Sequence, residues 1–154
     1  MTATSKQVTA FLKALDDQIA LQAVVDLYLI GGSAITLAYD DDNRTADIDL
    51  VEPPEFLITK GGPGTSLARK FGVYLSAVAD ISFSVPPDWR LHCRMIPPKL
   101  KRLRLHVPQA EDIVLGKLAR MEPKDFEDIL ALYRKGIINP RGLLRRLRQN
   151  KKEL

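Results

Sequence analysis

The amino-acid sequence predicts an α/β (α+β) fold, with a mixed β-sheet flanked by helices and a helical C-terminal region. Over 27–52 an apolar run, a double glycine, a short apolar segment and an alternating segment follow one another, which is typical of strand, turn, helix and strand. Short alternating segments lie between 73 and 107, and helical periodicity occurs near both ends. With 154 residues, we expect one domain over 1–154.

Composition narrows the classes of protein. Hydrophobic residues make up 45% of the chain and charged residues 27%, as in ordinary soluble globular proteins. No apolar run is long enough to cross a bilayer and no secretory leader starts the chain, so we expect a cytoplasmic protein. The single Cys93 excludes an internal disulfide and a cysteine-based zinc cluster.

Charge is distributed unevenly along the chain. Residues 1–60 contain 4 Lys or Arg and 10 Asp or Glu, whereas residues 61–154 contain 19 and 9. A metal-binding acidic half beside a basic half would suit a polyanionic substrate, and unevenly charged solvated faces are the simpler alternative.

The chain begins with a predicted helix over Ser5–Val25, whose apolar residues recur at steps of three and four and which we expect to pack on the sheet. The unit Leu27–Glu52 follows. Its polar segment, Asp40–Arg44, predicts a solvated loop between the helix and the second strand. Arg44 could reach a phosphate or pair with Asp47, and we favour the ion pair.

The order of this unit has chemical consequences. Gly31 and Gly32 at a strand end let the backbone approach a ligand, and the helix opened by Ser33 has free N–H groups that favour an anion. Asp47 and Asp49 alternate along the second strand, so they point to one face with their backbones roughly 7 Å apart. Paired carboxylates can hold Mg2+, so the unit predicts a phosphate cradle beside a metal site.

The segment after the second strand is predicted to be structural. The glycine-rich stretch at 61–64 lacks the Gly-Lys-Ser/Thr ending of a phosphate loop and predicts a turn. Gly72 is the predicted C-terminal cap of the helix that follows this turn. Short helices are expected on both sides of the turn, at Glu55–Lys60 and Thr65–Phe71.

The middle of the chain predicts three strands, at Val73–Val85, Arg94–Ile96 and Leu100–Val107. In the first, Asp80 is unusual for a strand and reads either as a solvent-facing residue or as a functional carboxylate. Trp89 is predicted to cover the sheet edge rather than to stack a base.

Two helices are predicted next, over Gln109–Met121 and Pro123–Lys135. The second has an apolar face at i, i+3, i+4 and i+7, formed by Phe126, Ile129, Leu130 and Tyr133. Asp125 and Asp128 lie three residues apart, off this face.

The last predicted helix, 140–152, is basic and carries a stripe of leucines. We expect it to bind nucleic acid through four arginines, Arg141, Arg145, Arg146 and Arg148. The alternative is a solvated helix that only packs its leucines on the core.

These residues carry a family resemblance. Gly31-Gly32-Ser33, a helix and Asp47-Ile48-Asp49 together resemble the signature of the polymerase-beta-type nucleotidyltransferase superfamily. More narrowly, the chain resembles the small stand-alone domains related to abortive-infection nucleotidyltransferase toxins. The C-terminal segments Glu111–Arg120 and Lys124–Ile129 are similar to a lysine helix and an acidic helix in those toxins.

The resemblance implies a nucleotidyltransferase-like fold and a role for several residues. Asp47 and Asp49 would hold Mg2+ or Mn2+, and Asp80 is the best candidate for a third carboxylate. Lys117 would neutralise phosphate charge, and Asp125 would orient Lys117 or act as a base. The alternative for Lys117 and Asp125 is an ion pair between helices. Gly31, Gly32, Ser33 and Arg44 are the candidate nucleotide-binding residues.

We therefore expect a metal-dependent transfer of a nucleotidyl group from a nucleoside triphosphate. The acceptor would be an RNA, such as the 3′ end of a tRNA, or a protein, and the protein would be a toxin with a cognate antitoxin. The alternative is a non-catalytic module of the same fold that binds nucleotide or nucleic acid. A cationic small-molecule acceptor fits less well, because the C-terminal half is basic.

Overall fold

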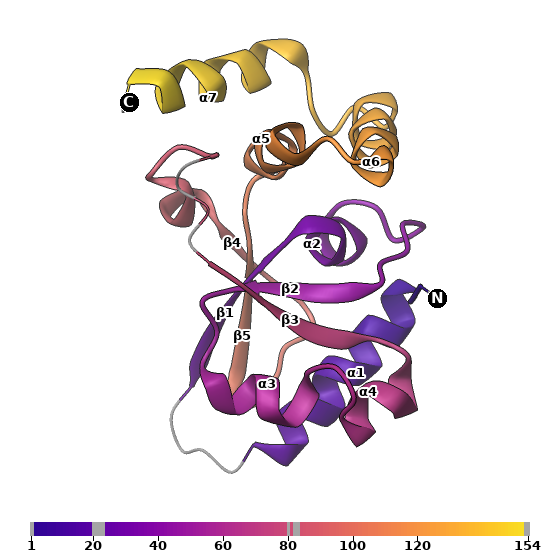
Figure 1. Ribbon diagram of the computed structural model, residues 1–154. Helices are drawn as coiled ribbons and strands as arrows, with labels where there is room; N and C mark the ends of the chain where they lie inside the picture. Colours follow the sequence, from indigo (N-terminus) through magenta and orange to yellow (C-terminus); the bar gives the residue numbers. More distant parts are fainter. Residues whose placement is uncertain (1, 20–23, 80, 82–83, 153–154) are drawn as a thin grey trace.

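The computed structural model describes residues 2–19, 24–79, 81 and 84–152 (Figure 1). In these residues, five strands form one mixed sheet with the order β3-β2-β1-β5-β4. The pairs β1–β5 and β2–β3 are parallel, and β1–β2 and β4–β5 are antiparallel. The strands are β1 (Val25–Ile30), β2 (Asp47–Val51), β3 (Tyr74–Val78), β4 (Arg94–Ile96) and β5 (Leu103–Val107). The predicted fold class is confirmed.

Helices lie on both sides of this sheet. Figure 1 shows α1, α3 and α4 below the strands and α2, α5, α6 and α7 above them. Their bounds are α1 Ser5–Gln18, α2 Gly31–Ala38, α3 Glu55–Gly61, α4 Ser66–Phe71, α5 Ala110–Arg120, α6 Pro123–Arg134 and α7 Pro140–Lys152. Gly72 ends α4 with a φ of 72°, as the predicted C-terminal cap. Among the described residues, no helix has both the length and the apolar composition needed to cross a membrane.

Alternation along the central strands separates the core from the side of the sheet that carries the site. Leu27, Leu29 and Leu50 are at most 1% exposed and belong to the main hydrophobic core. Successive side chains of a strand point to opposite faces. Asp47 and Asp49 therefore project from the other face of β2, where they are half-buried.

The first predicted helix and the last predicted strand are longer than the observed ones. The first helix ends at Gln18 rather than Val25, because Val25 pairs with Leu103 and begins β1. The predicted strand over Leu100–Val107 begins only at Leu103.

The β3 strand is also shorter than predicted. It ends at Val78, and the N–H of Val85 donates to the carbonyl of Ile81 at 3.2 Å in a turn instead of extending the strand. The 3-10 helix η1 (Trp89–His92) follows. Trp89 is only 2% exposed, and its ring lies 5.8 Å from that of Tyr28, so the predicted packing role of Trp89 is confirmed.

Candidate functional site

β1 leads directly into α2, which begins at Gly31 rather than at Ser33 as predicted. This start of α2, Gly31 and Gly32, is called the glycine turn here, and it lies directly against one carboxylate of β2. Gly31 has a φ of 67°, and Ile30 before it pairs with Asp49 across the two strands. A Cβ atom at Gly31 would lie 3.0 Å from Oδ2 of Asp49. The left-handed backbone and this close approach both require glycine. The predicted phosphate turn and a predicted metal ligand are therefore adjacent.

Gly32 and Ser33, which follow Gly31, have close neighbours within the protein. A Cβ at Gly32 would lie 2.9 Å from Oγ1 of Thr45. Ser33 is buried, and its hydroxyl donates to the carbonyl of Ile30 at 3.1 Å, so only the lone pairs of its oxygen are left for a ligand. Within the described residues, no side chain caps the start of α2. Its first N–H groups are therefore available to an anion.

Asp47 and Asp49 share one face of β2, as the alternation predicted. Burial raises the pKa of both carboxyl groups, and the neighbouring charge of Asp47 helps to raise that of Asp49 to about 6. The Arg120 guanidinium opposes both shifts. The two carboxylates are desolvated and repel each other, which a cation would relieve. Asp80, the predicted third ligand, lies outside the described residues, and the β3 residue beside Asp49 is Ser76.

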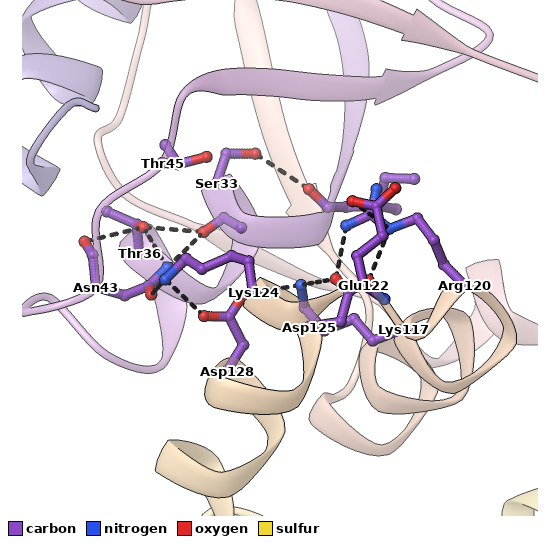
Figure 2. Close-up of polar contacts among 12 residues, drawn as sticks. Ser33, Thr36, Asn43, Thr45, Lys117, Arg120, Glu122, Lys124, Asp125 and Asp128 are labelled. Carbon is purple, nitrogen blue, oxygen red and sulfur yellow. Dashed lines mark hydrogen bonds and ion pairs between the residues drawn. The ribbon is translucent and has the colours of Figure 1, made fainter. Parts of the chain in front are cut away.

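A buried charge cluster joins α5 to α6 (Figure 2). Lys117 is 4% exposed, and its Nζ donates to Oδ1 of Asp125 at 3.1 Å and to Oδ2 of Asp128 at 2.9 Å. The ion pair between helices is therefore present. An ammonium group has three N–H donors, so one remains for a ligand in the cavity that Lys117 lines.

Arg120 belongs to the same cluster and was missed by the sequence reasoning. Its Nε and Nη2 donate to both carboxylate oxygens of Asp125, at 2.8 and 2.6 Å. This bidentate pair fixes the guanidinium plane, and the side chain is still 52% exposed. The spacing was the available signal, because Arg120 follows Lys117 by three residues and shares its helix face.

Asp125 sits at the centre of these contacts and is fully buried. Its hydrogen bonds to Arg120, and then to Lys117, hold the pKa of its carboxyl well below the usual range. The N–H of Glu122 also donates to it, at 3.0 Å. This geometry supports the orienting role for Asp125 rather than the role of a base, because its oxygens are already taken by donors.

The predicted apolar face of α6 is only partly confirmed, because Ile129 packs against the main core whereas the two aromatic residues of that face do not. Phe126 and Tyr133, which were expected to pack, are 57% and 55% exposed. Asp125, Asp128 and Leu132 form the buried face instead. The reason is electrostatic, since cationic side chains of α5 and of α6 itself match the buried carboxylates.

Hydrogen bonds connect this cluster to the glycine turn (Figure 2). The Nζ of Lys124 lies 2.8 Å from Oδ1 of Asp128 and donates to Oδ1 of Asn43 at 3.0 Å. The Nδ2 of Asn43 donates to the carbonyl of Gly32 at 3.2 Å and to Oγ1 of Thr36 at 3.0 Å. The turn and α6 are thus held at a fixed separation by residues that the sequence reasoning did not single out.

A cavity of about 420 Å³ lies at the junction of these parts. Gly31 and Asp49 line it from the sheet side, and Lys117 and Arg120 line it from α5. Much of the remaining wall is apolar and includes Ile30, Val78, Ile81 and Ile113. The cavity therefore combines the glycine turn, a carboxylate and two cations with an apolar wall.

The acidic loop lies apart from this cavity. Arg44 does not form the predicted ion pair with Asp47. Its Nε donates to Oγ1 of Thr2 at 3.1 Å instead, which ties the loop to the N-terminal segment. The three aspartates at 40–42 bring carboxylate oxygens within 4.8 Å of one another. Lys135 lies 2.6 Å from the first of them, so part of that charge is already balanced.

The arginines of α7 fall into two sets. Arg146 is 6% exposed, and its Nε and Nη2 donate to the two oxygens of Asp112, both at 2.8 Å. It anchors α7 and is not available to a polyanion, which corrects the prediction for this residue. The other three side chains are exposed, and none of them forms an ion pair with a described residue: Arg141, Arg145 and Arg148.

Comparisons with known proteins give a family match and a structural likeness. A family model described as a nucleotidyltransferase of unknown function matches residues 6–147. No curated protein shows a significant match to the chain. Among solved structures, the chain is similar to an antigenic nucleotidyltransferase-like protein from Paracoccidioides brasiliensis. The two share 19% identity, the match covers 86% of this chain and 78% of that one, and the TM-score is 0.48.

Proposed function

The chain belongs to this family of nucleotidyltransferases of unknown function, and we propose that it transfers a nucleotidyl group from a nucleoside triphosphate to RNA in a metal-dependent reaction. One observation carries the proposal. The positive-φ glycine turn touches Asp49, and two cations of α5 line the same cavity. Phosphates, metal ligands and counter-charges would therefore meet at one place.

The carboxylates of β2 fit a Mg2+ or Mn2+ ion. Asp47 and Asp49 offer hard oxygen ligands on one face, and burial raises the pKa of each carboxyl group. No cation is bonded directly to either carboxylate among the described residues. By resemblance, Asp80 is the proposed third ligand. When bound, divalent ions would stabilise the attacking and leaving oxygens of an in-line displacement at the α-phosphate.

The protein groups around the triphosphate have separate proposed roles. The backbone N–H groups at Gly31-Gly32-Ser33 would hold phosphate oxygens at the start of α2. Lys117 would donate its remaining N–H, and Arg120 its unused guanidinium donors. Asp125 would position both cations, because its two oxygens bond to them directly. An acceptor hydroxyl would then attack the α-phosphate, and pyrophosphate would leave.

The proposed acceptor is RNA, such as the 3′ end of a tRNA, because α7 presents unpaired positive charge. Three of its exposed arginines recur at steps of four and three, so they lie along one side of the helix: Arg141, Arg145 and Arg148. The resemblance to abortive-infection toxins extends the proposal to a toxin role with a cognate antitoxin as partner. The transfer reaction itself does not depend on that role.

Transfer can be tested directly. The protein would be incubated with Mg2+, total cell RNA and each α-labelled nucleoside triphosphate in turn, beside Asp49→Asn. We expect labelled RNA with the parent and none with the variant. Labelled protein would change the proposed acceptor. Nucleotide binding without any transfer would favour a non-catalytic binding module. A protein that neither binds nor transfers nucleotide would overturn the proposal.

A further inference from the structure

One face of α5 forms a wall of the cavity in front of Asp49. The lining residues on this face include Ile113, Gly116, Lys117 and Arg120. Arg120 lies about 10 Å beyond Ile113 along the axis, given the rise of an α-helix. The wall therefore changes from apolar to cationic along α5, and Gly116 stands between the two parts.

Gly116 has no conformational or packing reason to be glycine. It does not share the positive φ of Gly31, and a Cβ built on it would meet no described heavy atom within 4 Å. An interior helical glycine is less favourable than alanine. Alanine would therefore fit at this position and strengthen α5, whereas the same Cβ at Gly31 or Gly32 would collide with a side chain.

The cavity beside Gly116 is mainly apolar and has few free polar groups. Asp112 also lines it, but Arg146 already bonds to both of its carboxylate oxygens. The hydroxyl of Ser84 donates to the carbonyl of Ile81 at 3.1 Å. Such a wall suits the flat face of a ring better than the charged part of a ligand.

We propose that the nucleoside part of the triphosphate lies against Gly116, with its phosphates directed toward Lys117, Arg120 and the glycine turn. The missing side chain keeps the cavity deep enough for a base and its ribose, so Gly116 is a specificity-determining position. This inference rests on the proposed function, because it assigns a place to one part of the same substrate.

The test compares three variants with the parent protein. Gly116→Ala and Gly116→Leu add increasing volume with residues that favour helix. Gly142→Ala is the matched control, because its Cβ would make only ordinary contacts, at 3.4 Å or more, outside this cavity. Melting temperature is measured first, and then binding of ATP, GTP, CTP and UTP with Mg2+ by calorimetry. Inorganic tripolyphosphate with Mg2+ serves as a ligand without a nucleoside.

Both alanine variants should raise the melting temperature by about 2–4 °C. Gly116→Leu should weaken binding of the preferred nucleotide about tenfold or more, with a smaller loss for Gly116→Ala, while tripolyphosphate binding stays at the parent level. A nucleotide affinity that does not change with side-chain volume would overturn the inference and leave the proposed function intact. Equal losses for nucleotide and tripolyphosphate would also overturn it. A parent protein that binds no nucleotide would contradict the proposed function, and the inference with it.

Discussion

Two pairs of aspartates lie near the same helix, α5, and have opposite electrostatic environments. Asp47 and Asp49 on β2 are half-buried, and burial raises the pKa of both carboxyl groups, that of Asp49 to about 6. Asp125 and Asp128 on α6 are more deeply buried, yet hydrogen bonds from Arg120 and Lys117 hold the pKa of Asp125 well below its usual range. Burial alone therefore does not decide the charge state of a carboxyl group.

The difference indicates different uses for the two pairs. The α6 pair has its cations supplied by the chain, so it holds helices together. The β2 pair has no bonded cation among the described residues, so its oxygens are available to the proposed metal ion. Arg120 connects the two, because it bonds to Asp125 and its charge also acts on Asp47 and Asp49.

The largest expected effect comes from the β2 pair. Asp49→Asn keeps the side-chain size and removes a charged metal ligand, so nucleotidyl transfer should fall by about 10³-fold or more. The matched control is Asp41→Asn, in the exposed loop, which should transfer label at the parent rate. The measurement is incorporation of labelled nucleotide with Mg2+. Near-parent transfer by Asp49→Asn would mean that this carboxylate does not support catalysis.

A substitution in the α6 pair should mainly lower the stability of the fold, whereas the substitution in the β2 pair mainly lowers transfer. Asp125→Asn would leave the buried Lys117 and the guanidinium of Arg120 without their shared carboxylate, so the free energy of unfolding should fall by about 3–5 kcal/mol. Glu127→Gln, at an exposed position of the same helix, should change it by less than about 0.5 kcal/mol. Urea denaturation measures both. A small loss in Asp125→Asn would show that the cluster is not structural.

The pH dependence of stability should separate the pairs further. The folded-state pKa of Asp49, about 6, lies above its ordinary value of 3.8, so the ionised carboxylate destabilises the fold. This loss of stability is absent below pH 3.8, grows between pH 3.8 and about pH 6, and is complete at higher pH. The pKa of Asp125 is lowered, so its contribution is present at neutral pH and is lost as pH falls below the ordinary value.

Asp49→Asn should therefore stabilise the metal-free protein at pH 8 and have little effect at pH 4. The full shift corresponds to about 3 kcal/mol, and partial exposure to solvent reduces the expected gain to about 1–2 kcal/mol. Thermal unfolding without metal measures the gain, and added Mg2+ should raise the melting temperature of the parent but not of the variant. A variant that is less stable than the parent at pH 8 would contradict the cost assigned to the ionised Asp49, which comes first from burial and then from repulsion by Asp47.

The same contrast explains what the sequence could predict. Local sequence patterns were enough to predict the positions of four site residues, Gly31, Gly32, Asp47 and Asp49. A strand end, a glycine turn and alternation along one strand are each visible in a few consecutive residues. Their placement beside one another follows from the antiparallel pairing of β1 and β2. The fold class was predictable for the same reason.

The α5–α6 cluster was only partly predictable, because its charges are matched between separate helices. Apolar periodicity assigned Phe126 and Tyr133 to the core, whereas the buried face carries Asp125 and Asp128. Periodicity measures hydrophobicity and does not show that lysines and an arginine will neutralise those carboxylates. The role of Arg146 escaped prediction for the same reason, since its partner Asp112 lies 34 residues earlier in the chain.

The smallest expected effect on stability comes from α7, where unpaired arginines can be compared with the paired Arg146. Replacing Arg141, Arg145 and Arg148 with glutamine keeps helix propensity and removes only unpaired charge, so the melting temperature should change little. RNA affinity should fall, and the salt slope should become shallower by about 2, because three phosphate contacts to a single strand are lost.

Arg146→Gln should instead lower stability and leave the salt slope unchanged, since its guanidinium is held by Asp112. Binding across a salt series and thermal unfolding of both variants make the comparison. If the triple variant binds RNA as the parent does, α7 has no part in acceptor binding and its exposed arginines form only a solvated face.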